Sequence, residues 1–211
     1  MRKLVLKMSM SLDGFVCGPN NELDWMFSSS GGNSAEWTVG FLRNAGLHIM
    51  GARTFKDMSA WWPRSDEIFA PVMNEIPKAV FSRSGLANAT TSEGLREAQR
   101  RRPQNGALSP CANSWKEAAI ITGELATEVR RLKQQDGKLI VAHGGASFAQ
   151  SLVTTGLIDE YRLLVFPVAI GRGKPLFGKL TAPLRLKLQE ERSFGDGVVA
   201  HVYLASPETR S

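Results

Sequence analysis

The chain has 211 residues and a mass of 23.1 kDa, a length that suits one large domain or two small ones. Hydrophobic residues make up 43% of it, and the longest apolar run, Leu163–Ile170, is too short to cross a bilayer. The formal net charge of +6 permits an acidic partner, such as nucleic acid, a membrane surface or a phosphorylated small molecule. Composition therefore favours a globular domain and excludes collagen-like and membrane-spanning chains.

Cysteine and histidine spacing excludes several kinds of site. Cys17 and Cys111 are far apart and share no metal-type spacing, and the three histidines are scattered along the chain. We therefore expect reduced thiols, no disulfide framework and no metal site. Near the N-terminus, Lys7 interrupts the apolar stretch that a signal peptide needs, so we expect a cytoplasmic protein.

Apolar patterning predicts strands that alternate with helices through most of the chain. Expected strands cover 3–10, 47–50, 78–81, 138–142, 160–166, 184–188 and 198–205. Expected helices cover 34–45, 53–60, 124–135 and the segment from 146 to Gly156, with Ser34 and Thr122 as N-caps of the first and the third.

The order of these elements predicts the fold class. Strand, helix and strand over 138–166 form a βαβ unit, which implies parallel strands, whereas the last two strands read as an antiparallel hairpin. We expect an α/β fold with a mixed, mostly parallel central sheet flanked by helices. Residues 1–206 form one domain, 85–115 are an insertion or long loop with a possible short helix at 92–101, and 207–211 are a frayed tail. The polar composition of the insertion predicts that folding does not require it.

Glycines and polar residues follow the carboxyl ends of three predicted strands, where ligands bind in open α/β sheets. Gly144 and Gly145 open directly into a helix, and the free N–H groups of Ala146 and Ser147 suit a diphosphate. An ordinary tight turn without a ligand is the alternative.

Two further turns carry charge. Thr54 can cap its helix and bind a phosphate oxygen while Arg53 supplies the counter-charge, just after Gly51. Ser82 and Arg83 offer a hydroxyl and a guanidinium, which suit a phosphomonoester. Each turn alone is more simply read as structural, but three phosphate-suited turns on one sheet edge together favour a nucleotide.

Other motifs give weaker signals. The segment 171–175 fails as a Walker loop because Val168 and Pro175 stand where glycine and Ser/Thr are required. Asp13 follows an apolar strand and precedes Gly14, so it could donate a proton or cap a turn. The run Arg100–Arg102 reads as a solvated face.

Several of these segments together resemble the dihydrofolate reductase-like superfamily, and most closely the reductase domain of the riboflavin-biosynthesis deaminase-reductase. The resemblance covers about 1–84 and 115–205. It rests on Ser-Leu-Asp-Gly-Phe at 11–15, Met-Gly-Ala-Arg-Thr-Phe at 50–55, Val-Phe-Ser-Arg at 80–83, Val-Ala-His-Gly-Gly-Ala at 141–146, and 157–160 with 166–173.

The resemblance implies a three-layer fold, an NADPH-dependent reductase, a small heterocyclic or sugar-bearing substrate with a C=N or C=O bond, and a homodimer. By position, the implied cofactor-binding residues are Gly51, Arg53, Thr54, Ser82, Arg83, Gly144, Gly145, Ala146 and Ser147, with Ser82 and Arg83 at the 2′-phosphate. The implied substrate-side residues are Asp13, as the catalytic residue, with Gly14, Phe166 and Pro167.

The sequence also departs from the family pattern. Ala52 replaces the first arginine of the Met-Gly turn, and His143 stands where the riboflavin enzymes usually carry a glutamate. Dihydrofolate reduction is a second possible activity, for which Glu36 is the one acidic residue of the first predicted helix. A cofactor-binding protein without turnover and a basic nucleic-acid-binding protein are alternatives from other classes; the latter lacks any recognisable motif.

Overall fold

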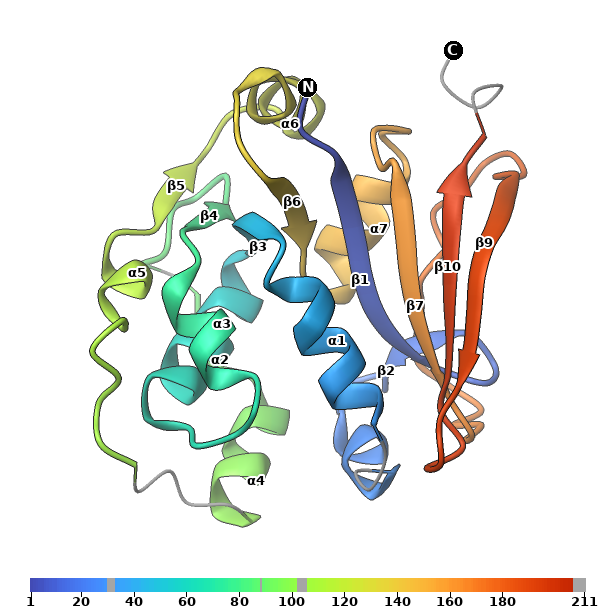
Figure 1. Ribbon diagram of the computed structural model, residues 1–211, viewed down its shortest axis with the longest axis horizontal. Coiled ribbons are helices and arrows are strands. Elements are labelled where there is room, and N and C mark those ends of the chain that lie inside the picture. Colours follow the sequence, from blue (N-terminus) through green and yellow to red (C-terminus); the bar gives the residue numbers. More distant parts are fainter. Residues whose placement is uncertain (30–32, 88, 102–105, 207–211) are drawn as a thin grey trace.

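The computed structural model describes residues 1–29, 33–87, 89–101 and 106–206, and the predicted tail at 207–211 lies outside them. Its centre is an eight-stranded sheet in the order β5-β4-β3-β6-β1-β7-β10-β9 (Figure 1). The strands are β1 (Leu4–Ser11), β3 (Ala45–Gly51), β4 (Lys78–Phe81), β5 (Ala119–Ile121), β6 (Leu139–Ala142), β7 (Glu160–Phe166), β9 (Leu186–Ser193) and β10 (Val199–Ala205).

The sheet is parallel from β5 to β7 and antiparallel at its C-terminal end, as the sequence predicts. The carboxyl ends of the parallel strands therefore meet at one edge. The central register pairs Leu6 with Ala142 and Lys7 with Arg162, which places β1 between β6 and β7. A separate two-stranded sheet, β2 (Phe15–Cys17) with β8 (Lys174–Pro175), joins the loop after β1 to the loop after β7.

Helices cover both faces of the sheet, so the fold has three layers. On one face, α1 (Ser34–Leu42), α2 (Ala52–Trp61), α3 (Ala70–Glu75) and α5 (Asn113–Lys116) bury a core around Val5, Met50 and Val141. On the other face, α6 (Leu125–Gln134) and α7 (Ala146–Val153) pack on Leu6, Ile140 and neighbouring residues. No helix in the described part of the chain is long and apolar enough to span a membrane.

Residues 85–115 are more structured than their composition predicts. The expected short helix is α4 (Glu93–Arg101), and α5 follows before β5. Leu95 and Trp115 are buried, and the Trp115 indole N–H donates to the Asn74 side chain at 2.7 Å. Trp115, at the C-terminal end of the segment, packs into the main core. That folding does not require the insertion stays a prediction, which deletion of residues 88–112 tests. Part of the run Arg100–Arg102 lies outside the described residues, while Arg96 and Arg100 pair with Glu93 on an exposed face.

Some local expectations also need correction. The first helix ends at Leu42 rather than Ala45, because Ala45 already pairs with Leu139 in the sheet. Ser34 is the first residue of that helix, and its N-cap is Asn33. The cap of α6 is Glu124 rather than Thr122; its carboxylate accepts the free N–H groups of Ala126 and Thr127. The sequence analysis did not predict the short strands β2, β5 and β8. It also did not predict the two 3₁₀ segments, η1 (Asp24–Ser29) and η2 (Trp62–Arg64).

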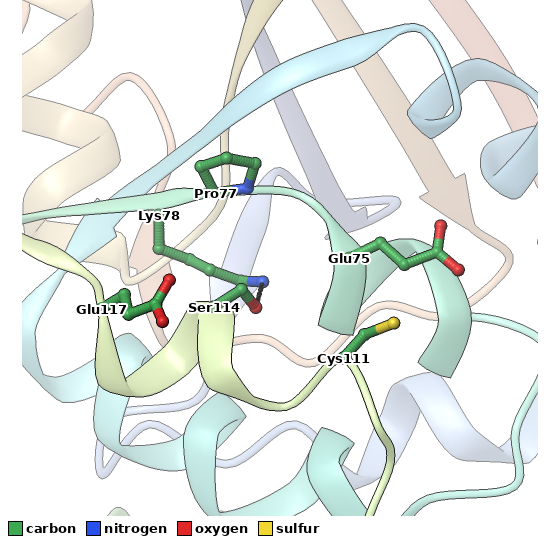
Figure 2. A pocket seen from close by; sticks show the side chains of 6 residues that line it. All are labelled: Glu75, Pro77, Lys78, Cys111, Ser114 and Glu117. Atoms are coloured by element: carbon green, nitrogen blue, oxygen red, sulfur yellow. Dashed lines mark hydrogen bonds between the residues drawn. The ribbon is translucent and has the colours of Figure 1, made fainter.

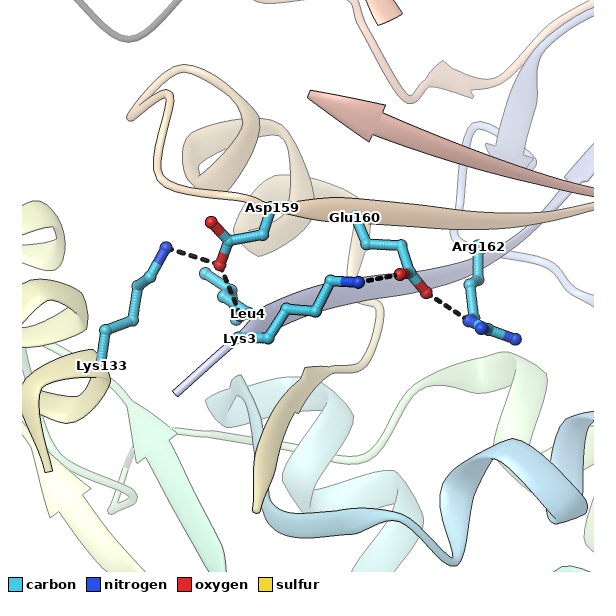
Figure 3. A network of polar contacts seen from close by, with 6 residues as sticks. All are labelled: Lys3, Leu4, Lys133, Asp159, Glu160 and Arg162. Carbon is cyan, nitrogen blue, oxygen red and sulfur yellow. Dashed lines mark hydrogen bonds and ion pairs between the residues drawn. The ribbon is translucent and has the colours of Figure 1, made fainter. Parts of the chain in front are cut away.

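Ion pairs occupy the amino-terminal edge of the sheet (Figure 3). The Glu160 carboxylate accepts from Lys3 Nζ and from Arg162 Nε, each at 2.5 Å. Asp159 accepts from Lys133 Nζ at 2.6 Å and from the Leu4 backbone N–H at 2.7 Å. Burial alone would raise the pKa of Glu160, but the hydrogen bonds from Lys3 and Arg162 bring it below its usual value. These contacts fix where β1, β7 and α6 begin or end.

Candidate active site

The carboxyl-terminal edge of the sheet carries a cavity of about 690 Å³. It lies where β3, β4 and β6 run into α2, the turn after β4, and α7. Eight of the nine residues that the sequence predicts for cofactor binding line it: Gly51, Arg53, Thr54, Ser82, Arg83, Gly145, Ala146 and Ser147. Three turns that are distant in the sequence therefore form one site, because parallel strands end at the same edge.

Glycine is required at the turn into α7. Gly145 has a φ of +85°, a conformation that side chains disfavour, and a Cβ there would lie 2.6 Å from Thr54 Oγ1. The α2 and α7 N-termini are therefore in near contact across the cavity. Gly51 is also constrained, because its Cβ would lie 3.1 Å from the Phe148 side chain. Because neither glycine has a side chain, the backbone N–H groups of these turns can face a ligand directly.

Gly144 differs from its neighbour. It does not belong to the cavity lining, and a Cβ there would lie 3.2 Å from the Met8 side chain, so its small size serves packing against β1. Sequence reasoning also missed lining residues. Ala89 and Thr90 come from the predicted insertion, Glu124 is the N-cap of α6, and Phe148 comes from α7.

The insertion is held at this cavity by α2. The Ser92 backbone N–H donates to Asp57 Oδ1 at 2.7 Å, one turn beyond the α2 residues that line the cavity. Burial raises the pKa of Asp57, while the hydrogen bonds from Ser92 oppose that effect. No local sequence signal joins Asp57 to Ser92, so the insertion could be placed only by the tertiary structure.

Asp13 lies at the neighbouring carboxyl ends of β1 and β7, outside the cavity. Its carboxylate accepts from Ser11 Oγ at 2.6 Å, from the Ile170 N–H at 3.2 Å and from the Gly171 N–H at 2.7 Å. These bonds, from Ser11 foremost, lower the pKa of Asp13 below its usual value. The geometry supports an ionised carboxylate that anchors the loop after β7 to the turn after β1.

The other substrate-side residues lie on the same side of the fold. Phe166 ends β7 and contacts Trp25 edge-on, with ring centroids 5.6 Å apart. A Cβ at Gly197 would lie 3.2 Å from Pro167, which places the turn between β9 and β10 against this segment. Gly14 has a φ of +88° in the turn that begins at Ser11, and its carbonyl accepts from the Leu176 N–H.

Three basic side chains come from neighbouring strands of the sheet, β1, β3 and the end of β6. Lys7 of β1, His48 of β3 and His143, which follows β6, are referred to below as the basic cluster. The His48 and His143 rings contact edge-on, with centroids 4.4 Å apart. Among the described residues, neither nitrogen of His48 has a hydrogen-bond partner, nor does Nε2 of His143. The sequence reading noted His143 only as a departure from the family and did not predict the cluster.

A smaller cavity of about 340 Å³ lies at the amino end of β4, lined by Lys78, Cys111 and Ser114 with two glutamates and Pro77 (Figure 2). The Lys78 ammonium donates to Ser114 Oγ at 2.6 Å and lies over the Trp115 ring, 4.3 Å from its centroid. Burial lowers the pKa of Lys78 to about 7. These contacts join β4 to α5, far from the turns of the larger cavity.

Comparison with known proteins defines the family. Residues 2–200 match the RibD C-terminal domain family. The chain belongs to the RibD C-terminal domain family. It is also 28% identical over 202 residues, 96% of this chain and 94% of the relative, to the uncharacterized protein YyaP of Bacillus subtilis strain 168.

Solved structures share the fold. A candidate riboflavin biosynthesis protein from Shewanella sp. PV-4 matches with a TM-score of 0.67 at 20% identity, covering 97% of this chain and 99% of that one. RibD from Acinetobacter baumannii matches with a TM-score of 0.63 at 18% identity, covering 98% of this chain and 58% of that one. These similarities confirm the dihydrofolate reductase-like fold, and the family supports a reductase-type function.

Proposed function

We propose that this protein is an NADPH-dependent reductase that transfers hydride to a C=N or C=O bond of a small substrate. The observation that carries the proposal is the cavity at the carboxyl ends of β3, β4 and β6, where three phosphate-suited turns converge. The family membership supports the reductase class, because the matching domain is the C-terminal domain of RibD.

The residues of the cavity fit a dinucleotide phosphate. Gly145 has a positive φ, and a Cβ on this residue would lie only 2.6 Å from Thr54 Oγ1. Because Gly145 has no side chain, a diphosphate could approach the backbone of this turn closely. Ala146 and Ser147 would supply N–H groups at the start of α7, and Arg53 and Thr54 would supply charge and a hydroxyl. NADPH supplies the hydride when bound, and the protein holds and orients it.

Ser82 and Arg83 would read the 2′-phosphate. Both line the cavity after β4, and a guanidinium pairs well with a phosphomonoester. The Ser82 hydroxyl donates to the Gly85 carbonyl, which holds the turn that presents Arg83. NADPH should therefore bind more tightly than NADH.

Titration of both cofactors against the fluorescence of the five tryptophans tests this specificity. Arg83→Ala should weaken NADPH binding by about 1.5–3 kcal/mol, roughly 10- to 150-fold, and leave NADH nearly unchanged. Arg185→Ala, which removes an exposed arginine next to β9, is the matched control. Equal affinity of the wild-type protein for the two cofactors would remove Ser82 and Arg83 from the assignment.

Dihydrofolate reduction is less well supported as the specific reaction. That activity normally uses a carboxylate on the first helix to bind the pterin, and Glu36 is exposed to solvent. The buried residues of α1 are Thr38, Val39, Phe41 and Leu42, and none of them is acidic. NADPH oxidation screened against dihydrofolate, the ribosylaminopyrimidine of riboflavin synthesis, and simple quinones or aldehydes separates these reactions.

The homodimer also remains a proposal, which rests on the family resemblance alone. Size-exclusion chromatography with light scattering measures the mass in solution directly. A mass near 46 kDa, twice that of the chain, would support the dimer, and a mass near 23.1 kDa would contradict it.

A further inference from the structure

A second cluster of reactive side chains lines the smaller cavity, at the amino end of β4, whereas the larger cavity lies beyond its carboxyl end. Lys78 is the first residue of β4, Ser114 belongs to α5, and Cys111 lies in the segment that leads into α5. Figure 2 shows the Lys78 side chain extending toward Ser114, with Glu75 and Glu117 in the same lining. None of these residues belongs to the proposed cofactor site.

Lys78 is buried without an acidic partner. Its residue is only 3% exposed, and lysines are rarely buried so deeply unless they are paired. Its Nζ donates to Ser114 Oγ at 2.6 Å and lies 4.3 Å from the centroid of the Trp115 ring. Within the described part of the chain Lys78 forms no ion pair, although Glu75 and Glu117 line the same cavity. One hydroxyl and one aromatic ring only partly offset the desolvation of an ammonium.

The hydrogen bonds of Ser114 identify the nucleophile of this cluster. The Ser114 hydroxyl donates to the Asn74 carbonyl, so its oxygen accepts in the contact with Lys78. That contact uses one N–H of the lysine, and in the neutral amine the nitrogen lone pair stays available. Burial lowers the pKa of Lys78 to about 7, so much of the amine is neutral near that pH. Because the Ser114 proton is held by a backbone carbonyl, Lys78 rather than Ser114 is the nucleophile.

The cavity favours a small, uncharged electrophile. Its volume of about 340 Å³ is at the lower end of the range for small-molecule pockets. The carboxylates of Glu75 and Glu117 disfavour a phosphate or carboxylate group in the same space. Neutral lysine amines form Schiff bases with carbonyl compounds. We propose that Lys78 is a covalent acceptor site for small neutral aldehydes, separate from the proposed cofactor site.

The reaction balances without an oxidant or a reductant. The Lys78 Nζ lone pair forms a bond to the carbonyl carbon, and the C=O π electrons move to the oxygen, which gains a proton while the nitrogen loses one. The carbinolamine then loses its hydroxyl group as water, which leaves a C=N bond to Nζ. The products are an imine and one water molecule, and the addition of water reverses the reaction. Protonation of the imine gives an iminium cation, which Glu75 and Glu117 stabilise electrostatically.

Reductive trapping tests the site in the full chain. The protein is treated with propanal and sodium cyanoborohydride at about pH 7.5, and propylation of each lysine is followed over time by peptide mass spectrometry. Lys187, an exposed residue of β9 at the opposite end of the sheet, is the internal reference. We expect Lys78 to be modified at least tenfold faster than Lys187. Modification of Lys78 no faster than that of Lys187 would overturn the proposal.

A charged aldehyde tests the selectivity of the cavity. Glyoxylate carries a carboxylate, so its rate at Lys78 relative to Lys187 should be at least tenfold lower than the same ratio for propanal. The double variant Glu75→Gln and Glu117→Gln should raise the glyoxylate ratio severalfold and change the propanal ratio less than twofold. Equal ratios for glyoxylate and propanal in the unaltered protein would contradict the preference for uncharged aldehydes.

Single lysine variants assign the fast modification. Intact-protein mass spectrometry should show that Lys78→Met lacks the fast propylation of the unaltered protein, whereas Lys187→Met keeps it. Fast propylation that persists in Lys78→Met would place the reactive amine elsewhere and overturn the assignment. Should Lys78→Met fail to fold, the peptide map of the unaltered protein decides the same question.

Discussion

Two lysines of the core differ in whether their charge is paired. At the amino-terminal edge, Lys133 is 7% exposed at its side chain and bonds both to Asp159 and to the Leu157 carbonyl. Further along the sheet, Lys7 in the middle of β1 has no such partner among the described residues, and it lies near imidazole nitrogens of His48 and His143 that also lack partners. Both lysines come from regular elements of the same core.

This difference in pairing has an energetic consequence for each lysine. A paired buried charge offsets its own desolvation and fixes the elements that carry it. An unpaired one costs stability, and proteins tolerate that cost mainly where a ligand will bind. Burial lowers the pKa of Lys7 to about 8, which is the direction expected for an ammonium that lacks a counter-ion. The comparison can be tested by removing each of the two charges in turn.

Lys133→Met should have the largest effect. It leaves the Asp159 carboxylate, 16% exposed at its side chain, without its ammonium, so we expect the free energy of unfolding to fall by about 3–5 kcal/mol. Urea denaturation monitored by circular dichroism measures this change. A loss below about 1 kcal/mol would mean that this pair contributes no more to the free energy of unfolding than a surface ion pair does.

Acid should destabilise the protein through the two buried histidines. Burial, reinforced by Lys7 and Lys78, lowers the pKa of His143 to about 3, and burial with His143 and Lys78 lowers that of His48. Because unfolding restores pKa values near 6.5, the unfolded state binds more protons below that pH, and stability falls as pH decreases. From pH 7 to pH 5 the loss should be about 2 kcal/mol from His143, and His48 should add a further loss in the same direction.

Urea denaturation at several pH values in this window measures that slope. The double variant His48→Gln and His143→Gln should lose less stability on acidification than the wild-type protein. An identical slope in the two proteins would show that other groups cause the acid sensitivity.

Lys7→Met should act in the direction opposite to Lys133→Met. The substitution removes an ammonium that burial disfavours and replaces it with an apolar side chain of similar length, so the free energy of unfolding should rise by about 1–3 kcal/mol. Thermal unfolding of Lys7→Met beside Lys133→Met gives the sign of each change. A loss of stability in Lys7→Met would show that the Lys7 ammonium is satisfied in the folded protein, which would weaken the contrast between the two lysines.

Asp13→Asn should have the smallest effect on folding. An amide can still accept some of the bonds from Ser11, Ile170 and Gly171, but without charge, so we expect a small decrease in melting temperature. Once a substrate is known, unchanged specific activity would confirm a positioning role for this carboxylate. A large loss of turnover with unchanged NADPH affinity would instead restore Asp13 as a catalytic residue.

The sequence determined those parts of the protein that depend on neighbours along the chain. Strand β7 and the helix after Gly145 are encoded by local apolar periodicity and by glycine at a turn, so their bounds were close to those predicted. The cofactor-side turns were predictable for the same reason, because each is a short motif at the end of a strand. Where a cap or a short strand carried no distinctive pattern, as at Glu124 and β5, the prediction was wrong or absent.

Only the tertiary structure decided what lies across the sheet. The basic cluster depends on β6 inserting between β3 and β1, which are far from it in the sequence. Thr90 reaches the cavity because Asp57 binds the chain at Ser92, a contact between residues 35 positions apart. A strand sequence fixes which side chains share a face, but not which strand lies beside it. The site therefore divides into turns that local sequence encodes and a basic cluster that strand order assembles.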